Sequence, residues 1–131
     1  MAMIRFHQEG KYMKLVVFNV GSALCVYAEH QTTRIVFDIG KGNNFSPVND
    51  FLLPLYEKRG EHRLKNRNNR YGISQLIVSH PHKDHISDIQ EFDKNFYAHL
   101  LTTPNSKSPN GNPQNINWRK ITTPDDPDVK Y

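Results

Sequence analysis

The sequence predicts an α/β domain in which an antiparallel or mixed sheet carries helices on one face. Three observations indicate this fold class. Short runs rich in valine, isoleucine and phenylalanine occur between residues 14 and 39 and are separated by turn residues. Apolar residues then recur at helical spacing within residues 46–60. A compact apolar run at residues 74–79 precedes a second helical pattern that starts at residue 84.

The first part of the chain has the pattern of an antiparallel meander. We expect its strands at residues 14–20, 22–29 and 33–39. Gly21 and the polar residues 29–31 supply the turns between them, and their hydrophobic positions suit a sheet buried on at least one face. The glycine- and asparagine-rich residues 40–44 then predict a loop, and residues 74–79 a buried strand.

Two helices are expected after the meander. Ser46 offers a hydroxyl N-cap, Pro47 suits the first helical position, and Gly60 is a suitable stop. Pro54 lies inside this pattern and predicts a kink or an early end. The second helix is expected from Asp84 onward. Its apolar face would contain Ile86, Ile89, Phe92, Phe96 and Leu100.

Composition sets the broad class of the protein. A length of 131 residues suits one domain, which we place at residues 1–103, with residues 104–131 as a loop-rich continuation or truncated segment. The net charge of +4 is compatible with anionic partners and equally with a solvated basic surface. The single cysteine, Cys25, excludes an intrachain disulfide and is expected to be a buried thiol. Without a signal peptide or an apolar run long enough for a membrane span, we expect a soluble cytoplasmic protein that does not engage a membrane.

Potential metal ligands are concentrated in one short segment. His80, His82, Asp84 and His85 follow the apolar run at 74–79 directly, where the chain turns toward the second helix. Imidazole nitrogen and carboxylate oxygen suit Zn²⁺, and also Mn²⁺ or Fe²⁺. A lone histidine is more often a packed or hydrogen-bonded residue, and Asp84 alone could cap a helix. Four such groups at one strand-to-helix junction indicate metal binding.

The segment His-Pro-His-Lys-Asp-His at residues 80–85 resembles the H-x-H-x-D-H motif of the metallo-β-lactamase superfamily. Phe-Asn-Val-Gly-Ser-Ala at 18–23 and Val-Phe-Asp-Ile-Gly at 36–40 resemble the opening meander and the D-x-G turn of that fold. The subfamily that the chain resembles most is the metallo-lactamase-like domain of bacterial DNA-uptake competence proteins. The resemblance covers roughly residues 14–100, and its motif is specific for the superfamily but not for a substrate.

The resemblance implies a binuclear site with two zinc ions, or with manganese or iron. His80 and His82 would bind the first ion, and Asp84 and His85 the second. Asp38 on the D-x-G turn would orient these ligands, or would simply form the turn. Two ions would share a hydroxide that attacks an ester, amide or phosphodiester, with Asp84 orienting the water or accepting its proton.

The resemblance also implies that the chain corresponds to the N-terminal half of an αβ/βα sandwich. The remaining ligands of the family lie downstream of the motif, and no histidine follows His99. We therefore expect an exposed apolar sheet face that needs a partner, either a missing half-domain or another subunit. An incomplete, non-catalytic metal-binding domain is the alternative to a complete enzyme.

For the substrate, the subfamily resemblance favours a phosphodiester in nucleic acid or a nucleotide. A basic stretch at residues 57–71 could contact backbone phosphates or could be a solvated surface. Its candidate contacts are Lys58, Arg59, Arg63, Lys65, Arg67 and Arg70. Hydrolysis of a small ester, lactone or β-lactam remains the competing activity.

Overall fold

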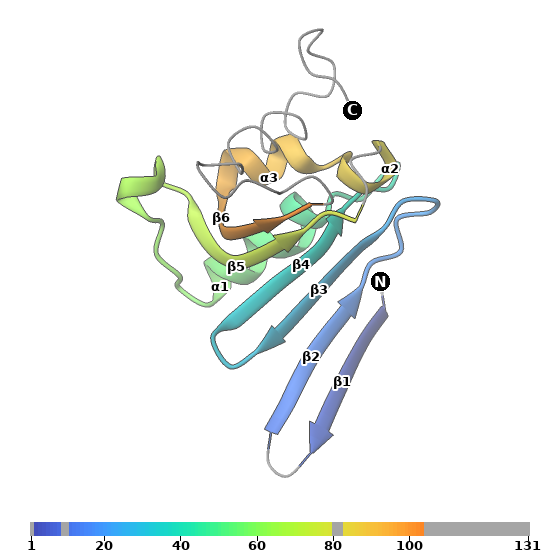
Figure 1. Ribbon diagram of the computed structural model, residues 1–131, viewed down its shortest axis with the longest axis horizontal. Coiled ribbons are helices and arrows are strands. Elements are labelled where there is room, and N and C mark those ends of the chain that lie inside the picture. Colours follow the sequence, from blue (N-terminus) through green and yellow to red (C-terminus); the bar gives the residue numbers. More distant parts are fainter. Residues whose placement is uncertain (1, 9–10, 80–82, 104–131) are drawn as a thin grey trace, which may run out of the picture.

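A computed structural model describes residues 2–8, 11–79 and 83–103, and these residues form an α/β fold built on one mixed sheet. The described strands lie side by side in chain order (Figure 1). They are β1 (Ala2–Gln8), β2 (Lys11–Val17), β3 (Cys25–His30), β4 (Thr33–Ile39), β5 (Tyr71–Ile77) and β6 (Phe96–Thr102). Strands β1 to β4 are antiparallel, whereas β4–β5 and β5–β6 are parallel pairs.

The predicted meander is confirmed in β2, β3 and β4. The bounds of β4 agree with the expected residues 33–39, while β2 begins and ends three residues earlier than expected. The strand β1 was not predicted. It pairs with β2 along its whole length, with Ala2 opposite Val17 and Gln8 opposite Lys11. Residues 104–131 lie outside the described residues.

The first helical segment consists of a π-helical turn, η1 (Val48–Leu52), followed by α1 (Leu53–Lys58). The hydroxyl of Ser46 accepts a hydrogen bond from the backbone N–H of Asn49 at 3.0 Å, as expected of an N-cap. The helical turns continue past Pro54, so the early end that this proline predicted does not occur. Gly60 follows the helix with φ +66°, a conformation that glycine adopts readily.

The prediction that the second helix extends to Leu100 is wrong. The turn α2 (Lys83–Ile86) is followed by α3 (Ile89–Asn95), and the chain becomes extended at Phe96 to form β6. Pairing with β5 satisfies the backbone groups on one side of this segment, and tertiary context overrides the helical spacing. Phe96 is buried as the spacing predicted, but Leu100 is 48% exposed.

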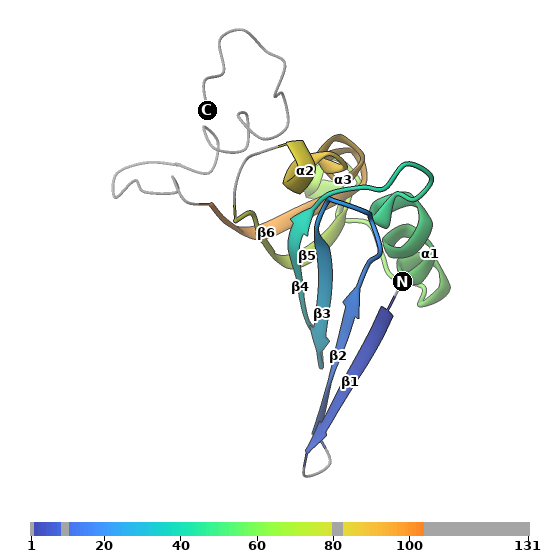
Figure 2. The same cartoon turned by 90° about the vertical axis from the view of Figure 1, so that its right-hand side faces the viewer.

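The helices cover one face of the sheet, as predicted. Tyr56 of α1 and Phe92 of α3 both pack on the ring of Phe96, with centroid separations of 5.0 and 5.5 Å. Figure 2 shows α1 on one side of the strands β2 to β4, which are seen nearly edge-on. Cys25 is fully buried in this core, as expected, and burial raises the pKa of its thiol.

The opposite face of the sheet carries apolar side chains that the described residues do not cover. Met13 and Phe37 are 41% and 36% exposed, and several neighbours are only half-buried. These neighbours are Leu15, Val17, Val26, Ile35 and Ile77. Since register places Val17 opposite Val26 and Val26 opposite Phe37, the residues form a continuous surface across β2, β3 and β4. We call this set, together with Leu100, the outer apolar face.

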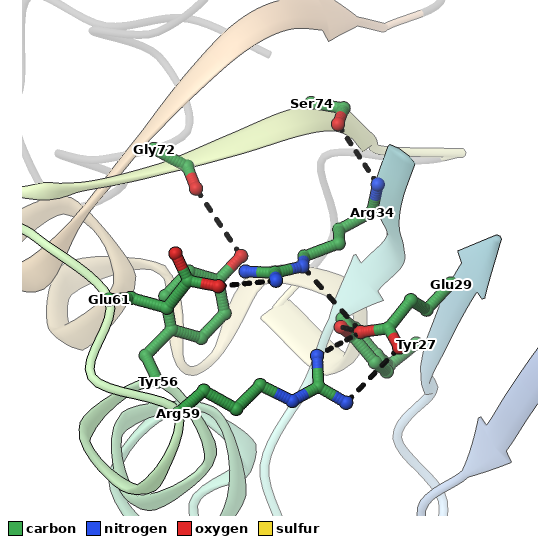
Figure 3. Close-up of polar contacts among 8 residues, drawn as sticks. All are labelled: Tyr27, Glu29, Arg34, Tyr56, Arg59, Glu61, Gly72 and Ser74. Atoms are coloured by element: carbon green, nitrogen blue, oxygen red, sulfur yellow. Dashed lines mark hydrogen bonds and ion pairs between the residues drawn. The ribbon is translucent and has the colours of Figure 1, made fainter. Parts of the chain in front are cut away.

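A polar network connects the end of α1 to the β3–β4 hairpin (Figure 3). Glu29 accepts hydrogen bonds from Tyr27 at 2.5 Å and from Nη2 of Arg59 at 3.1 Å, and it lies 3.5 Å from Nε of Arg34. Arg34 also forms an ion pair with Glu61. Burial raises the pKa of Glu29, but the hydrogen bonds from Arg59 and Tyr27 outweigh it, and the pKa is lowered overall.

We expect Glu29→Gln to destabilise the protein by about 2 kcal/mol near neutral pH. The lowered pKa means that the carboxylate stabilises the fold above its ordinary value of 4.5, and that this contribution is lost as pH falls through the lower folded-state value. The deficit of the variant should therefore shrink between about pH 7 and pH 3 in denaturant titrations. The exposed Glu57→Gln is the control, with an expected change below about 0.5 kcal/mol. A deficit independent of pH would contradict the role of this carboxylate.

Candidate metal centre

The candidate site lies at the carboxyl ends of the parallel strands β4 and β5. β5 ends at Ile77, and the backbone N–H of Val78 continues the pairing by donating to the carbonyl of Thr102 at 2.8 Å. Ser79 follows, and Asp84 and His85 lie on the short helix α2. The carboxyl ends of parallel strands are where open α/β sheets commonly bind ligands.

Asp38 is the buried centre of this region. Its side chain lies at the end of β4 and is nearly fully buried, with the backbone in the left-handed region at φ 54°. Oδ1 accepts the backbone N–H of Ser79 at 2.7 Å, and Oδ2 accepts the Ser79 hydroxyl at 2.6 Å. Oδ2 is also 3.0 Å from Nδ1 of His85. The Asp38 carboxylate therefore connects the end of β4 to Ser79 and to His85.

The contact with Asp38 orients the imidazole of His85. With its proton on Nδ1 directed at Asp38, the ring has a lone pair on Nε2. Nε2 lies 3.6 Å from Oδ2 of Asp84, whose side chain is 52% exposed. One imidazole nitrogen and one carboxylate oxygen thus lie close together at the surface. This donor pair fits a shared Zn²⁺, Mn²⁺ or Fe²⁺ ion.

Gly40 allows the backbone to pack closely beneath α2. A Cβ atom at this position would be 2.2 Å from the carbonyl oxygen of Asp84 and 2.7 Å from Cβ of Ala23. The N–H of Gly40 donates to the carbonyl of Leu24 at 2.9 Å. The N–H of Leu24 in turn donates to the carbonyl of Asp84 at 3.3 Å. The glycine of the D-x-G turn is therefore needed for the position of Asp84, a role that its turn propensity alone did not indicate.

Asp88 is a structural part of the site that the sequence analysis missed. It is buried, and its Oδ2 accepts hydrogen bonds from the Ser46 hydroxyl at 2.7 Å and the Val48 N–H at 3.0 Å. Its own N–H donates to the carbonyl of Ile39 at 2.8 Å. Burial raises the pKa of this carboxyl group. Asp88 thus holds the start of η1 against the end of β4. In the sequence it was recognisable only as a polar residue between the apolar Ile86 and Ile89.

An open pocket of about 720 Å³ adjoins Asp84. Two loops, at residues 19–23 and 41–45, form its walls, and Ser87 completes it beside Asp84. The hydroxyl of Ser87 accepts the backbone N–H of Lys41 at 2.8 Å, which ties the second loop to the helical turn. Lys41 is the cationic residue of the lining. The pocket has the size of a small-molecule site and lies next to the candidate metal ligands.

The structure brings together some of the predicted site residues. Asp38, Asp84 and His85 form one contiguous group, whereas His80 and His82 lie outside the described residues. Within residues 13–79 and 84–103, no three histidine, cysteine, aspartate or glutamate side chains are arranged to hold a metal ion. The complete ligand set therefore remains a prediction from the motif.

The candidate phosphate contacts do not form one continuous row. Arg59 is paired with Glu29, and Arg70 with Asp93 at 3.0 Å. The remaining arginines stack on aromatic rings, and both lysines of the group are exposed. The stacked pairs are Arg63 on Tyr71 and Arg67 on Tyr97. The exposed lysines are Lys58 and Lys65.

Comparisons with protein-family models, with curated proteins and with solved structures find no significant match to this chain. In the part of the chain that the structure describes, no helix is both long and apolar enough to cross a membrane.

Proposed function

We propose that the protein is a metal-dependent hydrolase that acts on a phosphodiester. The observation that carries this proposal is the arrangement of Asp38, His85 and Asp84 at the end of the parallel strands. A carboxylate that holds a histidine through Nδ1 is the usual support of a histidine metal ligand. The same arrangement could stabilise a turn, but the Asp84 carboxylate, 3.6 Å from Nε2 of His85, also borders the pocket.

Each residue of the site has a distinct expected role. His80 and His82 would hold one ion, and Asp84 with His85 a second, while Asp38 keeps His85 and the turn at Ser79 in place. Bound ions would supply an activated water and positive charge for the developing oxyanion. Asp84, which borders the pocket, would orient that water and accept its proton.

The pocket supports an anionic substrate. Lys41 supplies positive charge, while Asn19, Asn43 and Ser22 offer neutral hydrogen-bonding groups. Such groups suit a phosphate ester better than a β-lactam carrying a large apolar substituent. A nucleotide or a nucleic acid end is the substrate class that fits both this lining and the basic residues 62–70.

The proposal is tested by metal content and by hydrolysis in the same samples. We expect the purified protein to hold about two zinc ions per complete site by plasma mass spectrometry. Asp84→Ala and His82→Ala should lower this content and abolish hydrolysis of bis(para-nitrophenyl) phosphate. Glu57→Ala, at an exposed position on α1, is the matched control and should change neither. Unchanged metal in both site variants would refute the assignment.

Substrate comparisons separate the competing hydrolytic activities. Para-nitrophenyl acetate and a chromogenic β-lactam test ester and β-lactam hydrolysis with the same metal-loaded protein. We expect turnover of the phosphodiester alone. Faster turnover of either other substrate would assign the site to small-molecule hydrolysis instead.

An incomplete domain that needs a partner is the second candidate, and the outer apolar face favours it. Phe37 and Leu100 are 36% and 48% exposed on a sheet face that no described helix covers. Exposed apolar surface of this kind commonly marks an interface. Sedimentation analysis of Phe37→Ser beside the original protein tests this, because dissociation of an oligomer together with loss of metal would show that a partner completes the site.

A further inference from the structure

A cluster of arginine and aromatic side chains lies at the start of β6. The guanidinium carbons of Arg67 and Arg70 are 4.5 and 5.4 Å from the ring centroid of Tyr97. His99 meets the same ring edge-on, with a centroid separation of 5.5 Å and an interplanar angle of 82°. We call Arg67, Arg70, Tyr97 and His99 the arginine–aromatic surface.

The loop that presents the arginines is fixed by its own backbone. Leu64 donates its N–H to the carbonyl of Arg70 at 2.6 Å, and its carbonyl accepts the N–H of Asn69 at 3.0 Å. Asn68 and Asn69 have left-handed backbone conformations, with φ of 56° and 59°, which turn the chain back. Nε of Arg70 donates to the carbonyl of Arg67 at 2.9 Å. A closed loop of this kind loses little further freedom when it binds a ligand.

Charge in this loop is of one sign. Residues 62–70 contain Arg63, Lys65, Arg67 and Arg70 and no acidic residue. Asp93 neutralises Arg70 through the 3.0 Å ion pair. Among the described residues, the guanidinium of Arg67 has the ring of Tyr97 as its contact and no hydrogen bond or ion pair. Arg67 and His99 are both exposed, so each offers a flat polar or aromatic surface to solvent.

We propose that the arginine–aromatic surface binds single-stranded nucleic acid. Unpaired bases stack on histidine rings and on the planes of arginine guanidinium groups, while nearby cations contact the phosphates. A duplex keeps its base faces stacked within itself and cannot use Arg67 or His99 in this way. An acidic protein would pair with the charges but would have no use for the stacked geometry.

This inference deepens the proposed function and rests on it for the role of the strand as substrate. Gly72 of β5 lies opposite Tyr97 in the register, and Ser79 follows it seven positions later at the candidate site. At about 3.3 Å per residue this is about 23 Å along the strand. A single-stranded nucleic acid held at Tyr97 and His99 can reach along β6 to the candidate metal site if it has roughly seven stacked nucleotides.

Fluorescence anisotropy with a labelled oligothymidine of about twelve nucleotides tests the proposal. The titrations are made in EDTA, so that binding is measured independently of metal and hydrolysis. We expect binding at low salt that weakens as salt is raised, and weaker binding to a duplex of equal length. Arg67→Ala and His99→Ala should each reduce affinity about tenfold.

Arg67→Lys separates stacking from charge, because lysine keeps the charge and loses the planar group. We expect this variant to retain the salt dependence and to lose most of the affinity that Arg67→Ala loses. Lys14→Ala, which removes one charge on β2, far from β6 in the strand order of the sheet, should change affinity less than about twofold. Thermal melting confirms that each variant is folded.

Three results would overturn the proposal: no binding at low salt, equal affinity of Arg67→Lys and the original protein, or equal affinity for single strand and duplex. The last two would indicate a general polyanion surface. None of these results bears on metal content or on turnover of bis(para-nitrophenyl) phosphate, so the proposed hydrolase can fail or succeed separately.

Discussion

Replacing Gly40 by alanine is expected to destabilise the protein by at least about 3 kcal/mol and to lower its metal content. The added methyl group would lie 2.2 Å from the carbonyl oxygen of Asp84 and 3.0 Å from the backbone nitrogen of Leu24. Both neighbours are backbone atoms, so no flexible side chain can move aside. Relief of the clash requires α2 to separate from the turn at residues 38–40, which displaces Asp84 and His85.

Gly42→Ala is the matched control for this substitution. A Cβ atom there would be 3.4 Å from Cα of Val20, which is an ordinary contact. Thermal melting in EDTA should show a fall of more than about 10 °C for Gly40→Ala and little change for Gly42→Ala. Similar melting temperatures for the two variants would mean that α2 can move away from the turn at residues 38–40 without loss of stability. The argument for a tightly packed D-x-G turn would then be wrong.

The parts of the fold that follow from local patterns were predictable. The strand at residues 33–39 is rich in β-branched and aromatic residues and is bounded by turn residues, so its predicted limits agree with the structure. Residues 4–7 also alternate between apolar and polar side chains, but β1 was not predicted. The prediction that the helix continues past Phe96 was wrong because the two apolar residues at helical spacing, Phe96 and Leu100, can also lie in a strand. Its pairing with β5 depends on residues far away in the sequence.

The candidate site was predictable to the extent that its residues belong to short motifs. Asp38 and His85 are 47 positions apart, yet each lies in a recognisable motif, and the structure brings them within 3.0 Å. Asp88 and Gly40 belong to the same region through contacts with Ser46, Val48 and the Asp84 carbonyl, which no local pattern encodes. Sequence identifies chemistry that is local, whereas packing between distant segments is seen only in the folded structure.

Substituting Asp38 should have the largest effect on metal binding among residues that are not themselves proposed ligands. We expect Asp38→Asn to lower zinc affinity about 10- to 100-fold, measured by competition with a chromogenic chelator. The amide keeps the size of the side chain and one oxygen that can accept the N–H of Ser79. It loses the charged acceptor that holds Nδ1 of His85. The imidazole would then lose both its fixed orientation and part of its basicity as a ligand.

The alternative is that Asp38 only forms the turn at the end of β4, with its left-handed backbone at φ 54°. Asparagine tolerates this conformation as well as aspartate does. A purely turn-forming residue would therefore allow Asp38→Asn with unchanged zinc affinity, whereas Asp38→Ala would lower stability in either case. Since Asn keeps the turn and removes the charge, the zinc affinity of that one variant decides whether this carboxylate supports a metal ligand or only a fold.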